Sequence, residues 1–433
     1  MELANYILKE LKKKGADDVI VELKKQEAYQ IKFSNNKIVK TGSEVLFNLG
    51  IFMAKDKRIV VTSVRDFNKK EADKTINNLI RFARNIKPNE NYSGIAKGSF
   101  KYKEIKNSYD KKLVYSDDID LVNKGINIAL EKVKRADGIF EKHFTDTLLI
   151  SSNNVEANEK GTHLYFSIRT FANKDASGHM NSCSKMLNKL EIEEASKKAS
   201  EIAVSALNPI NGNPGKYDVI FSPMAIAPIL GNIMDATSIF MVESGLSFLA
   251  NKLNKKLGNF TLIDQGNLEN GFNSSKFDSE GVPTQKNIVI NNGTLKTYLH
   301  NTSTAKRYKT KTTANAGLVS PTPFNVIIDG KKGDVFKDIK NGLWITNVWY
   351  TRFQNYSTGD FSTIPRDGIF LIKNGEIIKS LKNLRVSENM LNVMNNIKLL
   401  GKKAVHLKSW ESELPIVSPE ILVKNVNITK PKL

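Results

Sequence analysis

Apolar residues near the N-terminus recur every three or four positions, the spacing of an amphipathic helix. Leu3, Ile7, Leu8 and Leu11 would share one face of this helix, and Gly15 would end it in the left-handed conformation that glycine tolerates. The runs that follow alternate apolar with polar residues, as strands do. They predict strands at 18–23, around 29–33, at 45–54 and at 58–64.

A second helix is predicted over residues 69–86. Its inner side would carry Ala72, Ile76, Leu79, Ile80 and Phe82. A helix, several strands and another helix in this order favour an α+β layer with the helices on one face.

The next part of the chain repeats this order after a polar, poorly patterned connector at 87–116. We expect Ser116 to cap a helix that runs to Lys134 and has Ile119 on its buried side. Strands are predicted at 139–150, 162–171 and 176–186, followed by a helix over 190–206. Residues 1–207 thus form a predicted N-terminal α/β region of two sub-layers in series, with a break near 87–116.

The turn-rich segment 208–215 predicts a domain boundary. After a strand at 217–221 and a helix begun by Pro223, short strands with Gly and Asn turns dominate. Asn292-Gly293 and Asn374-Gly375 predict two hairpins with type I′ turns. The predicted fold class is therefore α+β, with N-terminal helices packed on antiparallel sheets and a C-terminal domain, residues 208–433, of mainly twisted antiparallel β-structure.

Composition narrows the class of protein. The 433 residues are too many for one ordinary core, no stretch approaches 18 consecutive apolar residues, and the N-terminus has no signal-peptide pattern. The single cysteine, Cys183, excludes an intramolecular disulfide, and we expect a cytoplasmic protein without membrane association. The net charge of +20 comes from scattered lysines rather than one basic block, so a charged surface is favoured over an acidic partner or nucleic acid.

No spacing in the chain predicts a metal site or a known nucleophile motif. None of the five histidines lies within five positions of another, so no HExxH-like pair exists. His179 and Cys183 are four residues apart, and on the expected strand they would be about 13 Å apart, too far to share one ion. The chain also lacks a GxSxG elbow, a P-loop and a GxGxxG fingerprint. We therefore predict no metal-binding and no catalytic residue.

Two polar segments are harder to explain by folding alone. The first contains Asp278, Glu280 and Gly281, and the second is the run from Tyr356 to Ser362. Carboxylates beside glycine and proline can hold a sharp loop, or they can line a groove. The residues alone leave both roles open.

These segments resemble the TldD/PmbA family. The matching residues of the first are Asp278, Glu280, Gly281, Pro283, Thr284, Gln285, Asn292-Gly293, Leu295-Lys296, Tyr298-Leu299, Thr302 and Ala305. Thr313 to Ala316 is similar to the family's Thr-Gly-Asn-Ala, with Ala314 in place of the usual glycine. Residues 357–362, with the Lys373–Glu376 hairpin, resemble the PmbA side of the family.

The resemblance implies a function and also a departure from it. The catalytic TldD branch carries a His-Glu-x-x-x-His zinc motif on the helix that corresponds to residues 229–238, and a further cysteine ligand near the C-terminus. This chain has no histidine between Met180 and Tyr298 and no cysteine in 402–433, where His406 is the one possible donor. The resemblance thus implies a non-catalytic PmbA-like (TldE-like) subunit without a cofactor of its own, and a barrel-like or sandwich C-terminal core.

In this interpretation a TldD-like catalytic subunit brings the zinc, forms a heterodimer with this chain and hydrolyses unfolded or small peptides; the chain alone could be a homodimer. Candidate groove or interface residues are Asp278, Glu280, Gly281, Asn315, Thr358, Gly359, Asp360 and Phe361. The alternatives are a self-sufficient hydrolase with a different site and, more remotely, a basic nucleic-acid-binding protein.

Overall fold

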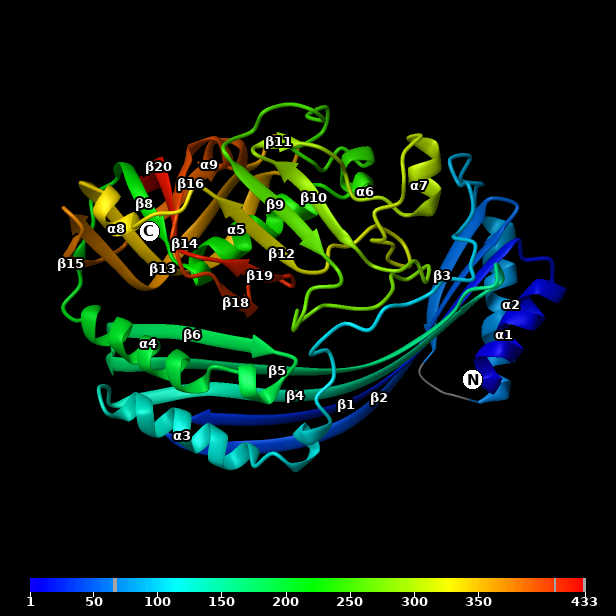
Figure 1. Cartoon of the computed structure of the whole chain (residues 1–433), viewed down its shortest axis with the longest axis horizontal. Coiled ribbons are helices and arrows are strands. Elements are labelled where there is room, and N and C mark those ends of the chain that lie inside the picture. Colours follow the sequence, from blue (N-terminus) through cyan, green and yellow to red (C-terminus); the bar gives the residue numbers. More distant parts are fainter. Residues whose placement is uncertain (65–67, 409, 431–433) are drawn as a thin grey trace.

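Six long antiparallel strands form one sheet in the N-terminal half of the computed structural model, which describes residues 1–64, 68–408 and 410–430 (Figure 1). In spatial order they are β3 (Arg58–Val64), β2 (Lys37–Lys55), β1 (Asp18–Ser34), β4 (Arg135–Ser151), β5 (Glu156–Asn173) and β6 (Ala176–Ser184). The expected two sub-layers therefore share one sheet, because β1 pairs with β4 along nearly its whole length. The separate short strands expected at 18–23 and 29–33 are one continuous strand, as the polar residues between them keep their pairing.

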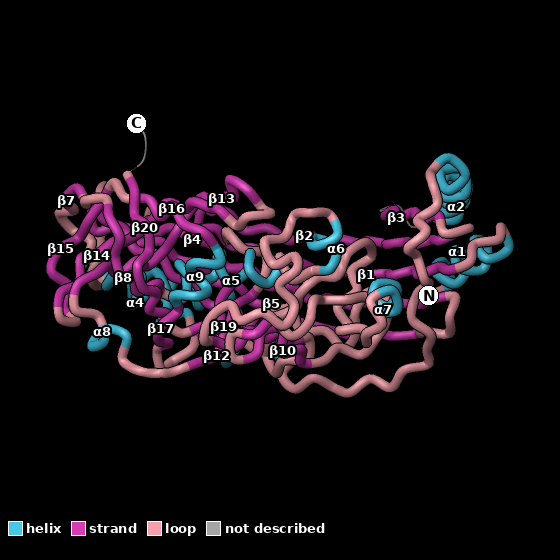
Figure 2. Tube along the Cα trace, turned by 90° about the horizontal axis from the view of Figure 1, so that it is seen from above, coloured by secondary structure: helices cyan, strands magenta, loops and turns pink. Residues whose placement is uncertain are grey.

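Four helices cover one face of this sheet. They are α1 (Glu2–Lys13), α2 (Lys69–Asn85), α3 (Asp118–Leu130) and α4 (Ile192–Ser205). Val19 and Val21 of β1 pack in the cluster with α1 and α2, whereas Ile31 and Phe33 of the same strand pack in the cluster with α3 and α4. All four β1 residues are odd-numbered and lie on one face, since side chains alternate along a strand. Figure 2 shows α1 and α2 at the end of the long strands that is far from β14 and β15.

Four details of the predicted helices were wrong. Phe82 and Ile119 are 54% and 51% exposed, because each lies just outside the buried stripe of its helix. The third helix is capped by Asp117, whose side chain accepts a hydrogen bond from the Asp120 N–H, and it ends at Leu130 rather than Lys134.

The C-terminal half contains a five-stranded barrel, one of the two expected forms. Its strands, in order around the barrel, are β13 (Asn341–Asn355), β8 (Gly215–Phe221), β20 (Ile421–Thr429), β16 (Arg385–Asn389) and β14 (Asp360–Lys373). The barrel closes because β14 also pairs with β13. Helix α5 (Pro223–Asp235) begins at the Ser222 N-cap and is buried in the same core. The fold is α+β, as the sequence predicts.

A second sheet packs against the barrel. Its order is β11 (Thr294–Leu295), β10 (Lys286–Asn291), β9 (Phe260–Gln265), β12 (Val326–Gly330), β19 (Pro415–Ser418) and β18 (Val405–Lys408). The remaining elements are β7 (Ile210–Asn211), β15 (Glu376–Lys382), β17 (Ile397–Leu400), α6 (Ile239–Glu243), α7 (Thr302–Arg307), α8 (Val335–Asp338), α9 (Met390–Asn396) and 3₁₀ turns at Lys111–Tyr115 and Leu187–Lys189. Both Asn-Gly turns have the two positive φ angles that the type I′ turn requires, 43° and 79° at the first and 50° and 84° at the second. Within the described residues, no helix combines the length and hydrophobicity needed to cross a bilayer.

Candidate functional site

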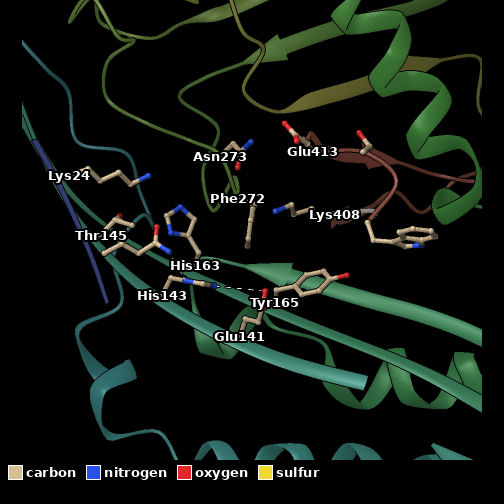
Figure 3. Close-up of a pocket in the computed structure, with 13 residues that line it drawn as sticks. Lys24, Glu141, His143, Thr145, His163, Tyr165, Phe272, Asn273, Lys408 and Glu413 are labelled. Carbon is tan, nitrogen blue, oxygen red and sulfur yellow. Dashed lines mark hydrogen bonds and ion pairs between the residues drawn. The ribbon is translucent and has the colours of Figure 1, made fainter. Parts of the chain in front are cut away.

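A groove separates the helix-free face of the long sheet from the C-terminal domain. Three adjoining hollows of about 500, 450 and 380 Å³ make it up. The first and third share Lys24, Thr145, His163 and Asn273, and the first and second share Trp410. The groove is therefore continuous along the sheet, and Figure 3 shows its first hollow.

Strand alternation explains which side chains reach this groove. The first hollow is lined by Lys24 of β1, by Glu141 and His143 of β4, and by His163 and Tyr165 of β5. The residues between them, such as Phe140, Leu164 and Phe166, face the helices instead. The opposite wall comes from the C-terminal domain and includes Phe272, Lys408 and Glu413 (Figure 3).

The first hollow combines positively and negatively charged side chains with two histidines. His143 and His163 are directly opposed on β4 and β5, and His143 Nδ1 lies 3.2 Å from the Gln26 amide nitrogen. The hydrogen bond with His143 lowers the pKa of Glu141, while burial and then Lys185 lower the pKa of His163 well below its ordinary value. The Phe272 ring lies edge-on to His163 and 5.4 Å below Lys408 Nζ. These groups can bind a polar, extended ligand, but they form no cluster of metal ligands.

The second hollow holds a serine–histidine contact that is not a catalytic pair. Ser167 Oγ lies 2.8 Å from His179 Nε2, while Asn347 and Arg169 both donate toward Nδ1. Two donors at Nδ1 place the ring proton on Nε2, so His179 donates to Ser167 and cannot act as its base. Burial also lowers the pKa of His179.

The buried carboxylate of Asp367 joins this cluster across the two halves of the molecule. It accepts hydrogen bonds from Arg169 at 3.0 Å, Ser177 at 2.7 Å and Asn347 at 2.9 Å. Arg169 and Ser177 belong to the long sheet, whereas Asn347 and Asp367 belong to the barrel. Burial raises the pKa of Asp367, but Arg169, His179 and the two neutral donors lower it more, so the net shift is downward. The cluster fixes the second hollow's two walls against each other.

Helix α5 is where the family resemblance predicts a zinc motif. It presents the amide of Asn232, which donates to the Pro228 carbonyl at 2.8 Å, and the carboxylate of Asp235. Gly231 packs so closely on Ser412 that an added Cβ would lie 2.5 Å from the hydroxyl. Neither imidazole nor thiolate is on this helix, and residues 1–64, 68–408 and 410–430 contain no group of three or more His, Cys, Asp or Glu side chains able to hold a metal. These residues do not fit a catalytic zinc.

Asp278 and Glu280 form a buried acidic pair in a tight loop. Asp278 accepts hydrogen bonds from the N–H groups of Glu280, Val282 and Ala316, each at 2.9 Å. Burial raises the pKa of both carboxyls, and the neighbouring Glu280 raises that of Asp278 further. Gly281 has φ 77°, and a Cβ there would meet Val155, in the turn between β4 and β5, at 2.3 Å. Asp278 thus holds the loop in its turn and ties it to Ala316, and it also lines the third hollow.

Asn315 is fully buried beside this loop. Its amide donates to Asp264 at 2.8 Å and to the Thr322 carbonyl at 3.0 Å, and its oxygen accepts from Asn287 at 3.1 Å. Ala314 before it has φ 55°, which explains why the family has glycine at this position. Asn315 therefore organises the loop from within.

Thr358 and Gly359 lie in the turn between β13 and β14, and Asp360 and Phe361 are the first residues of β14. Asp360 accepts hydrogen bonds from Asn389 at 2.8 Å and from the Thr358 hydroxyl. Both hydrogen bonds lower the pKa of Asp360, and the one from Asn389 has the larger effect. Gly359 has φ 83°, and Phe361 is buried in the core. This turn lines none of the three hollows.

The structure does not bring the eight candidate residues together in one site. No hydrogen bond or ion pair that we find among the described residues joins the Asp278 loop to the Thr358 turn, and the groove is lined largely by residues that the sequence analysis did not single out. A usable signal existed in residues 143–145 and 163–165, where polar side chains alternate with apolar ones within long strands. They indicated a polar face but not what it faces.

Comparisons with known proteins agree with this architecture. Residues 102–207 match the central domain, and residues 214–430 the C-terminal domain, of the PmbA/TldA metallopeptidases. An uncharacterised protein of Methanocaldococcus jannaschii is 28% identical over 397 residues, 88% of this chain and 89% of that protein. A metalloprotease of the same organism is 31% identical over 224 residues, which cover 47% of this chain and 48% of that protein.

Solved structures show the same fold. TldE from Thermococcus kodakarensis superposes with a TM-score of 0.86 at 21% identity, over 99% of this chain and all of that chain. A putative modulator of DNA gyrase from Thermotoga maritima gives 0.87 at 21% identity, over 99% of both chains. The C-terminal match alone spans half of the sequence. The chain belongs to the TldD/PmbA family of metallopeptidases.

Proposed function

We propose that this chain is the non-catalytic subunit of a two-chain metallopeptidase that cleaves unfolded or small peptides. A TldD-like partner supplies the zinc and activates the hydrolytic water. The observation that supports the proposal is helix α5, which carries Asn232 and Asp235 in the stretch that, by the family resemblance, corresponds to the zinc motif of the catalytic branch. A missing imidazole pair is not a conservative change, because neither an amide nor a single carboxylate replaces two neutral nitrogen ligands.

The groove gives this subunit a role in holding the peptide. Its walls offer lysine and glutamate side chains, histidines and aromatic rings along a continuous path between sheet and domain. Such a path suits an extended chain of mixed sequence better than one compact ligand. A folded protein would be excluded, which accounts for a preference for unfolded substrates.

Co-expression with a TldD-like chain from the same organism tests the proposal. We expect a stable complex whose peptide hydrolysis stops when a chelator removes zinc, while this chain alone is inactive. Chelator-resistant turnover by this chain alone would establish the self-sufficient hydrolase instead. Binding to DNA or RNA that falls steeply with salt would favour the nucleic-acid alternative.

A charge reversal tests the groove separately. Lys24→Glu changes the first hollow by two charges, and Lys379→Glu makes the same change on the exposed strand β15, away from it. We expect the first variant to raise the KM of the complex for an acidic peptide roughly fivefold, or about 1 kcal/mol, through weaker charge attraction. The second variant should match the wild type. Equal KM values for both variants would show that the groove does not bind the substrate.

A further inference from the structure

The outer edge of β2 is open over much of its length. Strand β3 pairs with β2 only from Leu49 to Lys55, and no other described strand pairs with this edge. Every residue from Val39 to Leu46 is exposed, including Val39 at 62% and Val45 at 55%. Figure 1 shows β2 on the side of the sheet away from the C-terminal domain. An open edge of this length, with exposed apolar side chains, is a template for pairing with another strand.

The sequence of this edge is symmetric in chemical character about Gly42. Counting outward in both directions, Thr41 corresponds to Ser43, Lys40 to Glu44, Val39 to Val45 and Ile38 to Leu46. When two such strands run antiparallel with Gly42 facing Gly42, each hydroxyl opposes a hydroxyl, each lysine a glutamate and each valine a valine. Opposite charges and branched apolar pairs stabilise directly opposed positions of antiparallel strands.

We propose that this edge pairs with the same edge of a second copy of the chain, with the two-fold axis at Gly42. The partner strand is inferred to be a second copy because this segment is complementary to itself. The two-fold rotation that brings Lys40 of one copy opposite Glu44 of the other also forms the second Lys40–Glu44 pair. The dimer would join the two six-stranded sheets edge to edge. This inference goes beyond the proposed function and does not depend on it.

The local structure permits this pairing. A Cβ placed on Gly42 would meet no atom within 4 Å, so the centre of the edge is unobstructed. Lysines on a free edge usually discourage pairing, yet in this register Lys40 faces Glu44 of the other copy. The pairing of β2 with β1 has a bulge next to Ile38, so the regular part of the interface runs from Lys40 to Glu44.

Charge variants test the register. Lys40→Glu and Glu44→Lys each place like charges at both ends of the symmetric pairing, and we expect each to weaken the dimer at least tenfold in sedimentation velocity. An equimolar mixture of the two variants should restore wild-type association, because every pair between them is complementary. Lys40→Glu faces Lys32 and Glu44→Lys faces Ala28 on β1, so both chains should keep the wild-type circular dichroism and melting curve. Association that is unchanged in the single variants, or not restored by mixing, overturns the proposal.

A cysteine at the axis tests it independently. In the proposed dimer the two Gly42→Cys residues are directly opposed, with Cα atoms about 5 Å apart, within disulfide range. Val39→Cys is the matched control, since its two copies would lie about 20 Å apart. The native Cys183 is buried and should not interfere. Mild oxidation should cross-link the first variant and not the second. A wild-type chain that stays monomeric up to about 100 μM, with no cross-link in Gly42→Cys, contradicts the proposal.

Discussion

Replacing Asp367 with asparagine removes the negative charge from the buried cluster that joins the long sheet to the barrel. The asparagine keeps the size of the side chain and can still accept the hydrogen bond from Ser177. It leaves Arg169, whose side chain is 23% exposed, without its carboxylate. Removing one partner of a fully buried ion pair costs about 3–5 kcal/mol. Because Arg169 keeps some contact with water, we expect a loss of about 2–3 kcal/mol in the free energy of unfolding.

Chemical denaturation at pH 7 measures this loss. The matched control is Glu10→Gln, which neutralises the exposed ion pair with Lys13 and should change the free energy by less than about 0.5 kcal/mol. A double-mutant cycle with Arg169→Met isolates the pair, and we expect a coupling of at least about 1 kcal/mol. If Asp367→Asn costs no more than the control, the cluster does not hold the two halves together.

The pH dependence provides a second check on Asp367. Its pKa in the folded chain is below the unfolded value of about 3.9. Its contribution is therefore complete above the unfolded pKa and is lost as the pH falls through the folded pKa. The difference between the wild type and Asp367→Asn should shrink below about pH 4. A difference that stays constant across that range would contradict the assigned ion pair.

Three further predictions concern the loop around Asp278 and the turn at Thr358. Glu280→Gln should stabilise the chain by about 1 kcal/mol at pH 8 and have little effect near pH 4. The reason is that burial raises the pKa of the Glu280 carboxyl, so the wild type loses stability as the pH rises from the unfolded to the folded pKa. Denaturation curves at both pH values measure the gain, and an equal gain at both would refute this reasoning. Ala314→Gly should raise the free energy of unfolding by up to about 1 kcal/mol by relieving the left-handed alanine, and a loss would refute the strain. Asp360→Ala should cost about 1 kcal/mol by freeing Asn389 at the α9 N-terminus, yet leave the groove's peptide KM unchanged; a raised KM would place the turn at the substrate.

Much of the fold could be predicted because local patterns and tertiary packing agree. The spacing of Ile76, Leu79 and Ile80 and the Asn-Gly turns each point to one structure, and the chain adopts it. The continuity of β1 could not be predicted, because residues 24–27 are polar and look like a break. Their pairing with β2 and β4 keeps them in the strand, which local propensity cannot reveal.

The site was harder to predict than the fold. Motif reasoning finds residues that are close in sequence, such as Asp278 and Glu280, and the structure gives them a loop-holding role. The groove is instead built from strands that are far apart in the sequence, as Lys24 and His143 illustrate, and from a domain that follows later in the chain. Polar alternation marks these positions as a surface, but only the arrangement of sheet and barrel makes that surface a groove.

The most direct test of the central proposal is the zinc content of each chain, measured by mass spectrometry of metals after the complex with a TldD-like subunit has been purified and separated. We predict one zinc per TldD-like chain, none on this chain, and peptide hydrolysis only when both chains are present. Stoichiometric zinc on this chain alone, with hydrolysis that a chelator abolishes, would contradict the account.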